Sequence, residues 1–159
     1  MNSATVITLY GVLLFLHILG AGVWLGGEAA MFGLRALALS SGDRARAVAL
    51  ARDTDRLNKL VISPAVGLLL GAGFWLVLEG HWGFDRFFVV FGLAGFAASS
   101  LLGGVVTAPG GKALQKAVEV RGADSPEVGS LMRRIQLGLL LDVLILTAIV
   151  FVMATKPTL

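Results

Sequence analysis

Long apolar segments alternate with polar connections along this chain. Each segment is long enough to hold the roughly 20 apolar residues that a helix needs to cross a bilayer. The pattern predicts four transmembrane helices, at about residues 5–39, 57–78, 87–107 and 126–155. We therefore expect an all-α fold, an integral membrane four-helix bundle that forms a single transmembrane domain over residues 1–159.

The composition agrees with this pattern and excludes a soluble globular protein. Hydrophobic residues make up 57% of the chain and charged residues 14%, with a mean hydropathy of +0.87. A soluble domain of this size needs far more charge to cover its surface. Cysteine is absent, which excludes disulfides, thiolate metal sites and cysteine nucleophiles.

The positions of the basic residues predict the topology. Of the 13 lysines and arginines, all but Arg86 and Lys156 lie in or beside two connections, at residues 40–56 and 108–134. Because basic loops stay in the cytoplasm, we expect both termini outside, in a multi-pass protein of the bacterial inner (plasma) membrane. Most of the basic residues behind the net charge of +3 lie in or beside these two connections. It therefore indicates topology, and no nucleic acid is expected as a partner.

The first predicted helix carries its polar side chains on one face. At 100° per residue, Trp24, Glu28 and Arg35 lie within about 20° of His17. Ionisable groups are costly against lipid, and those inside a membrane are functional by default. We expect this face to point toward other helices or a cavity. The alternative for each group is a purely structural role in helix packing.

Two ionisable residues on different helices are expected at the same depth. His17 is placed roughly 18 Å from the outer end of the first helix, and Asp142 roughly 19 Å from that of the fourth. We therefore predict a direct or water-bridged hydrogen bond between them. Such a bond would fix the tautomer of a ligating histidine or serve as a proton relay.

Glu28 is expected about 16 Å closer to the cytoplasm than His17, at the level of three arginines. We predict that it forms an ion pair or proton relay with Arg133 or Arg134. Arg35 lies on the same helix face but about 10 Å along the axis, so it is the less direct partner.

Glycines form two Gly-xxx-Gly pairs, Gly22 with Gly26 and Gly67 with Gly71. Small residues at this spacing let helix backbones come close together. The pattern indicates tight helix packing. The alternative is that these glycines leave flat room for a planar ligand such as a porphyrin.

The segment "LHILGAGVWLGGEAAMFGLRAL" (residues 16–37) resembles small bacterial membrane proteins. These are the copper-resistance D family, its uncharacterised four-helix relatives, and the HemJ-type protoporphyrinogen oxidases. His17 followed by Trp24 matches their first-helix pattern, and "LDVLILTAIVFVMATKP" (141–157) resembles the end of the uncharacterised relatives. The resemblance implies a four-helix bundle with a site at His17. For the HemJ-type proteins it further implies heme binding or porphyrinogen oxidation.

Three functions remain open from the sequence. The first is a heme-binding, redox-linked protein that holds heme b with His17 as the metal ligand, and with Trp24, Gly20 and Asp142 around the cofactor. The second is transport of copper or protons past His17 and Asp142. The third is an accessory subunit of a larger membrane complex. The expected partners are the lipid bilayer and either a second copy in a homodimer or that larger complex, and no residue is assigned a catalytic role.

Overall fold

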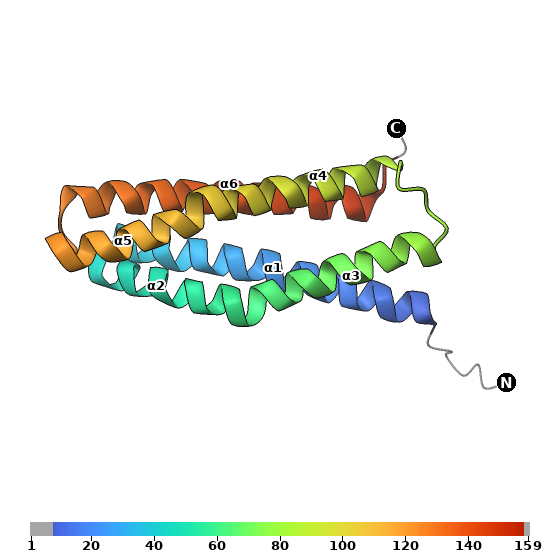
Figure 1. The fold of residues 1–159 in the computed structure, drawn as a ribbon, viewed down its shortest axis with the longest axis horizontal. Helices are drawn as coiled ribbons and strands as arrows, with labels where there is room; N and C mark the ends of the chain where they lie inside the picture. Colours follow the sequence, from blue (N-terminus) through green and yellow to red (C-terminus); the bar gives the residue numbers. More distant parts are fainter. Residues whose placement is uncertain (1–7, 158–159) are drawn as a thin grey trace.

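The structure is a computed structural model that describes residues 8–157, and it is built from helices. In chain order the elements are α1 (Leu9–Ser40), α2 (Arg44–Leu57), η1 (Asn58–Ile62), α3 (Ser63–Glu79), α4 (Phe87–Leu102), η2 (Gly103–Thr107), α5 (Ala108–Arg121) and α6 (Pro126–Thr155). Because α2, η1 and α3 form one continuous helix, as do α4, η2 and α5, the chain folds into four long helical rods (Figure 1). The fold class is therefore confirmed.

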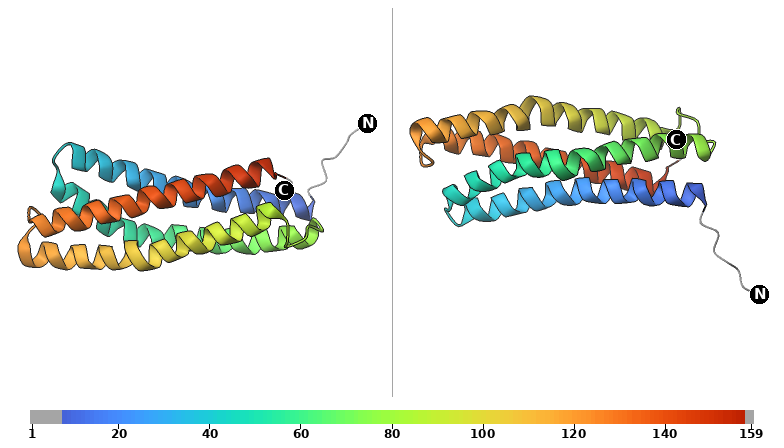
Figure 2. Two further views of the ribbon diagram at one scale, coloured as in Figure 1. Left: turned by 90° about the horizontal axis from the view of Figure 1, so that it is seen from above. Right: turned by 60° about the horizontal axis from the view of Figure 1, so that its bottom comes forward.

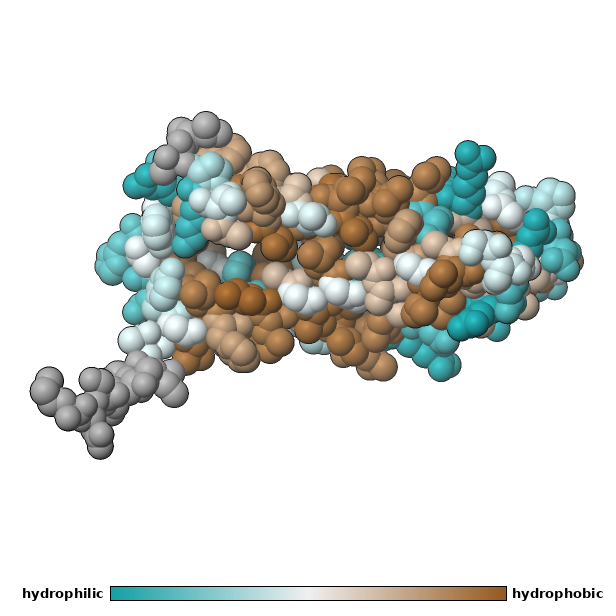
Figure 3. All heavy atoms as spheres, turned by 180° about the vertical axis from the view of Figure 1, so that it is seen from behind, coloured by the Kyte–Doolittle hydropathy of each residue, from teal (hydrophilic) through white to brown (hydrophobic). Residues whose placement is uncertain are grey.

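All four rods are long and apolar enough to cross a membrane. On the face that Figure 3 shows, hydrophobic residues form a belt across the middle of the molecule, and hydrophilic residues gather at its two ends. The protein is therefore a multi-pass integral membrane protein. The start of α1 and the end of α6 lie at the same end of the bundle (Figure 1). We call this the terminal end, and the other, which holds α2 and α5, the basic end.

The helices lie beside one another in two pairs. α1 packs along α3, α4 packs along α6, and α1 also contacts α6 (Figures 1 and 2). Within residues 8–157, no Cα atom of α3 lies within 8 Å of a Cα atom of α4 or α6. The buried members of both apolar clusters lie at the basic end, around Leu114, Val128 and Leu139, or near the middle, around Trp24. The two pairs are therefore packed together most tightly at the basic end.

The two connections that carry most of the basic residues are largely helical in the structure. The sequence predicts polar connections at residues 40–56 and 108–134, yet helices α2 and α5 occupy most of them. The second and third rods thus extend well beyond the predicted limits of 57–78 and 87–107. The first predicted helix begins at Leu9 in the structure, and residues 5–7 of its predicted range lie outside the described residues.

Both extended rods contain a π-helical turn before a proline. η1 leads into Pro64, and η2 leads into Pro109. Proline has no N–H to donate and its ring clashes with the carbonyl four residues earlier. A wider turn accommodates both problems without ending the helix. Each rod therefore continues from the apolar belt into the basic end.

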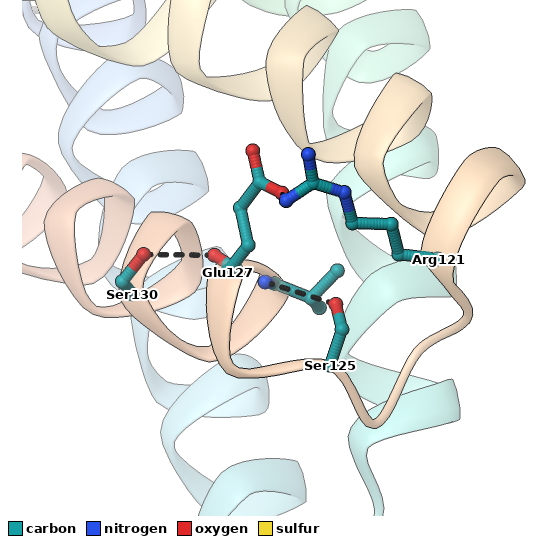
Figure 4. A network of polar contacts seen from close by, with 5 residues as sticks. Arg121, Ser125, Glu127 and Ser130 are labelled. Carbon is teal, nitrogen blue, oxygen red and sulfur yellow. Dashed lines mark hydrogen bonds and ion pairs between the residues drawn. The ribbon is translucent and has the colours of Figure 1, made fainter.

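Side-chain caps mark the starts of α1, α2 and α6. The Thr8 hydroxyl accepts a hydrogen bond from Gly11 N at 3.1 Å, and Asp43 accepts one from Arg46 N at 2.9 Å. Ser125 caps α6 with Pro126 in the first turn. Figure 4 shows this cap beside the ion pair between Arg121 and Glu127, which ties the end of α5 to the start of α6.

Candidate functional site

His17 lies where α1 crosses α3. Its Nδ1 is 2.9 Å from the carbonyl oxygen of Leu69 on α3. A carbonyl oxygen accepts and cannot donate, so Nδ1 must carry a proton, and in the neutral ring Nε2 then presents a lone pair. The side chain is part-buried. The sequence thus found the residue, and the structure assigns it the tautomer of a histidine that is able to bind a ligand through Nε2.

Two glycines make this contact possible. A Cβ at Gly73 would lie 2.8 Å from His17 Cε1 and Nδ1, so only glycine leaves the imidazole room beside the Leu69 carbonyl. A Cβ at Gly20 would lie 2.8 Å from the Ala65 carbonyl oxygen, which brings α1 directly against α3 at this level. Gly20, expected around a cofactor, therefore packs the helix that carries His17.

The Gly-xxx-Gly pairs have a different environment from the one expected. A Cβ added at Gly22, Gly26, Gly67 or Gly71 would meet no atom within 4 Å. The expected tight packing at these pairs is therefore wrong within one chain, because the rotation of α1 and α3 turns these glycines outward. The glycines that do make close contacts, Gly20 and Gly73, alternate with them on the same helices.

Trp24 lies on α1 between His17 and the basic end, where it packs against the other helix pair. Its ring is 5.9 Å from that of Phe96 on α4 at an interplanar angle of 73°, an edge-to-face arrangement. Ile62 and Leu146 pack in the same cluster. Trp24 therefore bridges the two helix pairs, seven residues or roughly 10 Å inward of His17.

Asp142 lies about one helical turn nearer the basic end than Trp24. Its hydrogen-bond partner differs from the predicted one. Its Oδ1 accepts a hydrogen bond from the Ser99 hydroxyl on α4, and both residues are buried. Leu146, one turn outward on α6, packs at the level of Trp24. Asp142 is thus about 11 residues, or roughly 16 Å, inward of His17 along the bundle. The predicted hydrogen bond between His17 and Asp142 is wrong. The two residues lie at different depths, because α1 and α6 are offset along the bundle axis.

Glu28 and Arg35 are buried further along the same face of α1, at 7% and 4% exposure. Arg35 Nη2 donates to the Thr54 hydroxyl on α2 at 2.6 Å, whereas its Nε and Nη1 have no described hydrogen-bond partner. The Glu28 carboxyl lies within electrostatic range of both Asp142 and Arg35. The face predicted from the helical period is therefore an interior face.

Arg133 and Arg134 do not pair with Glu28. Both are exposed on α6, whereas Glu28 is buried in the bundle. The ion pairs within residues 8–157 are Arg44–Asp124, Lys59–Asp55 and Arg121–Glu127, all on the surface of the molecule. The predicted partners of Glu28 are therefore wrong, and Arg35 is the basic residue whose charge acts on it.

Three partners in this site were missed from the sequence: Ser99, Thr54 and the Leu69 carbonyl. The sequence does not show which serine or threonine of another helix will bind Asp142 or Arg35, and a main-chain carbonyl has no sequence signal. Among the described residues, no group of three or more histidine or carboxylate side chains gathers to hold a metal ion. Any metal at His17 would therefore be carried by a ligand that supplies its other donors.

The comparison with protein families matches most of the chain. Residues 11–157 match the model of a family described as predicted integral membrane protein (DUF2269). Neither the curated proteins nor the solved structures contain a match. The matched range includes all four rods and each interior polar residue described above, and the chain belongs to this family of integral membrane proteins.

Proposed function

We propose that this protein binds heme b in the membrane, with His17 as the axial ligand. The observation that carries the proposal is the 2.9 Å contact between His17 Nδ1 and the Leu69 carbonyl oxygen. Histidines that ligate a metal through one nitrogen almost always donate a hydrogen bond from the other, which fixes the ring and increases its basicity. His17 has this second partner in place, and Nε2 has no partner among the described residues.

The surroundings of His17 suit a planar apolar ligand. The backbones of α3 and α4, which flank the terminal end, stay more than 8 Å apart between Cα atoms within the described chain. Trp24 and Phe96 lie inward of this region. Beside the imidazole, Gly73 presents backbone and no side chain. A porphyrin would therefore meet aromatic and apolar groups on the side nearer the membrane centre, as cofactor sites generally require.

The donor set fits a heme with one protein ligand per chain. Cysteine is absent, and the second histidine, His81, is exposed in the loop after α3 with its Nδ1 3.0 Å from the Glu79 carbonyl oxygen. When bound, heme would be held by His17 and would supply one-electron chemistry. The resemblance of residues 16–37 to HemJ-type proteins points to the same cofactor class and to the bacterial inner membrane.

Hemin titration of the purified protein tests this proposal. Wild-type protein is expected to develop a Soret band that saturates at one heme per chain. The His17→Ala variant should lose it, and the matched His81→Ala variant should keep it, because His81 lies in the exposed loop. A titration in which His17→Ala and wild type coincide would remove His17 from the account.

A second candidate is proton transfer through the bundle. It is favoured by the buried polar groups that lie between Trp24 and the basic end. Glu28, Asp142 and Arg35 are all less than a tenth exposed. Ionisable groups in such positions commonly mark proton pathways. In liposomes carrying a pH gradient, Glu28→Gln should slow proton flux, and Glu119→Gln on the exposed face of α5 should not. Flux in wild-type liposomes no faster than in protein-free ones would exclude this candidate.

A further inference from the structure

A groove of about 340 Å³ opens at the basic end, outside the bundle interior. The end of α1 and the start of α2 form one side of it, through Leu39 and Arg44. The first half of α6 forms the other side, through Gly129, Met132, Arg133 and Leu137 among others. A Cβ at Gly129 would meet no atom within 4 Å, so the missing side chain leaves this wall open.

The groove carries two positive charges and no negative one. Arg44 and Arg133 line it, and none of its lining residues is acidic. Arg44 Nη1 donates to the Asp124 carbonyl oxygen at 3.2 Å, and it is 4.0 Å from a carboxylate oxygen of Asp124, whose side chain is 95% exposed. Such an exposed pair contributes little, so Arg44 keeps donors available for an anion.

A second groove on the same end provides a contrast. It measures about 270 Å³, lies between α2 and α5, and is lined by Arg52 together with Asp53. Its charges balance. The excess of positive charge is therefore a property of the first groove and not of every hollow at the basic end.

The groove also has an apolar side that continues into the membrane belt. Leu39, Met132 and Leu137 line it. Further along α6, Leu140, Leu141 and Leu144 are exposed at 37%, 50% and 57%. The basic end is where the hydrophobic belt gives way to charged residues (Figure 3). An occupant of this groove would thus meet guanidinium groups at one side and hydrocarbon-facing leucines at the other.

We propose that this groove binds an anionic phospholipid, with Arg44 and Arg133 on the phosphate and the acyl chains along the exposed leucines of α6. Charge complementarity selects an anion, since basic pockets at the cytoplasmic side of transmembrane helices attract acidic headgroups. The leucines select a lipid over a free phosphate, which would leave the apolar side of the groove without a partner. This inference concerns the end of the molecule opposite His17 and is independent of heme binding.

Native mass spectrometry of the full-length protein tests the proposal. Protein in detergent is mixed with equal amounts of dioleoyl phosphatidylglycerol and dioleoyl phosphatidylcholine, and the bound lipid is counted. Wild type is expected to retain phosphatidylglycerol preferentially. Arg44→Gln and Arg133→Gln should each weaken that binding about fivefold, and the double variant about 25-fold. Arg52→Gln, in the charge-balanced groove, serves as the matched control and should match wild type.

Three results would overturn the proposal. The first is equal retention of the two lipids by wild type, which needs no variant to fold. The second is a loss in Arg52→Gln as large as in Arg133→Gln, which would indicate a general effect of surface charge. The third is displacement of phosphatidylglycerol by an equal concentration of glycerol phosphate, which would make the occupant a free phosphate and leave the leucines without a role.

Discussion

The Trp24 ring meets the Phe96 ring edge to face, with centroids 5.9 Å apart. This contact lies between two groups of polar side chains inside the bundle, which we call the two polar levels. His17 lies on the side of the terminal end, and Asp142 lies on the other side with Ser99 as its partner. The contact is apolar, with Trp24 buried and Phe96 partly buried, and it places aromatic side chains between the two polar groups. A ligand at His17 and a proton at Asp142 would therefore act on each other only weakly.

This separation predicts the behaviour of an Asp142→Asn variant. Asparagine keeps the oxygen that accepts from Ser99, so the protein should fold. With roughly 16 Å along the bundle between residue 142 and His17, the absorption spectrum of the hemin-loaded variant should match that of wild type. A shifted Soret band in Asp142→Asn would show that the two levels are coupled and that Trp24 does not separate them.

Gly73→Ala should weaken ligand binding at His17 without removing the histidine. The added Cβ would lie 2.8 Å from the imidazole and push it off the Leu69 carbonyl. Loss of such a supporting contact typically costs about 10–100-fold in affinity for a metal. Hemin titration measures the effect. Gly71→Ala is the matched control, since a Cβ there meets nothing within 4 Å, and equal affinities for the two variants would contradict this role of Gly73.

Thr54→Val should destabilise the protein. The Thr54 hydroxyl donates to the Leu50 carbonyl oxygen at 2.7 Å and accepts from Arg35 at 2.6 Å, so valine leaves the buried guanidinium without its one described partner. An unsatisfied buried donor costs about 1–3 kcal/mol. Unfolding in detergent, followed by circular dichroism, measures the loss. Thr54→Ser retains the hydroxyl and should remain close to wild type, and equal stability of both variants would exclude the bond as a stabilising contact.

The topology is testable because the chain contains no cysteine of its own. Asp85→Cys, in the loop after α3, should react with an impermeant thiol reagent added to intact cells. Ala49→Cys, exposed on α2 at the basic end, should react only after the cells are opened. This outcome follows from the excess of basic residues at that end. Labelling of residue 49 from outside would reverse the orientation.

The interior face of α1 could be predicted because it depends on a local property. At a period of 100° per residue, Trp24, Glu28 and Arg35 fall together wherever the helix begins, and the structure buries all three. The class of fold was accessible for the same reason. Long apolar runs need no knowledge of their neighbours to be identified as transmembrane helices.

Contacts between helices could not be predicted in the same way. The pairing of His17 with Asp142 assumed that α1 and α6 have their outer ends at the same depth in the membrane. In the structure the two residues are several helical turns apart along the bundle axis. The outward position of Gly67 and Gly71, and the inward position of Gly73, depend on how α3 is rotated against α1. Rotation and offset are set by side-chain packing along the whole interface, which no single segment encodes.

Imidazole rescue of a His17→Gly variant tests the central claim, that His17 is the axial ligand of a heme, most directly. Wild-type protein loaded with hemin should show the spectrum of histidine-ligated heme, His17→Gly should lose it, and added imidazole should restore it by occupying the vacated position. His81→Gly should be unaffected, since that residue lies in the exposed loop. A spectrum of His17→Gly identical to wild type, or no Soret band in the wild-type protein itself, would contradict the claim.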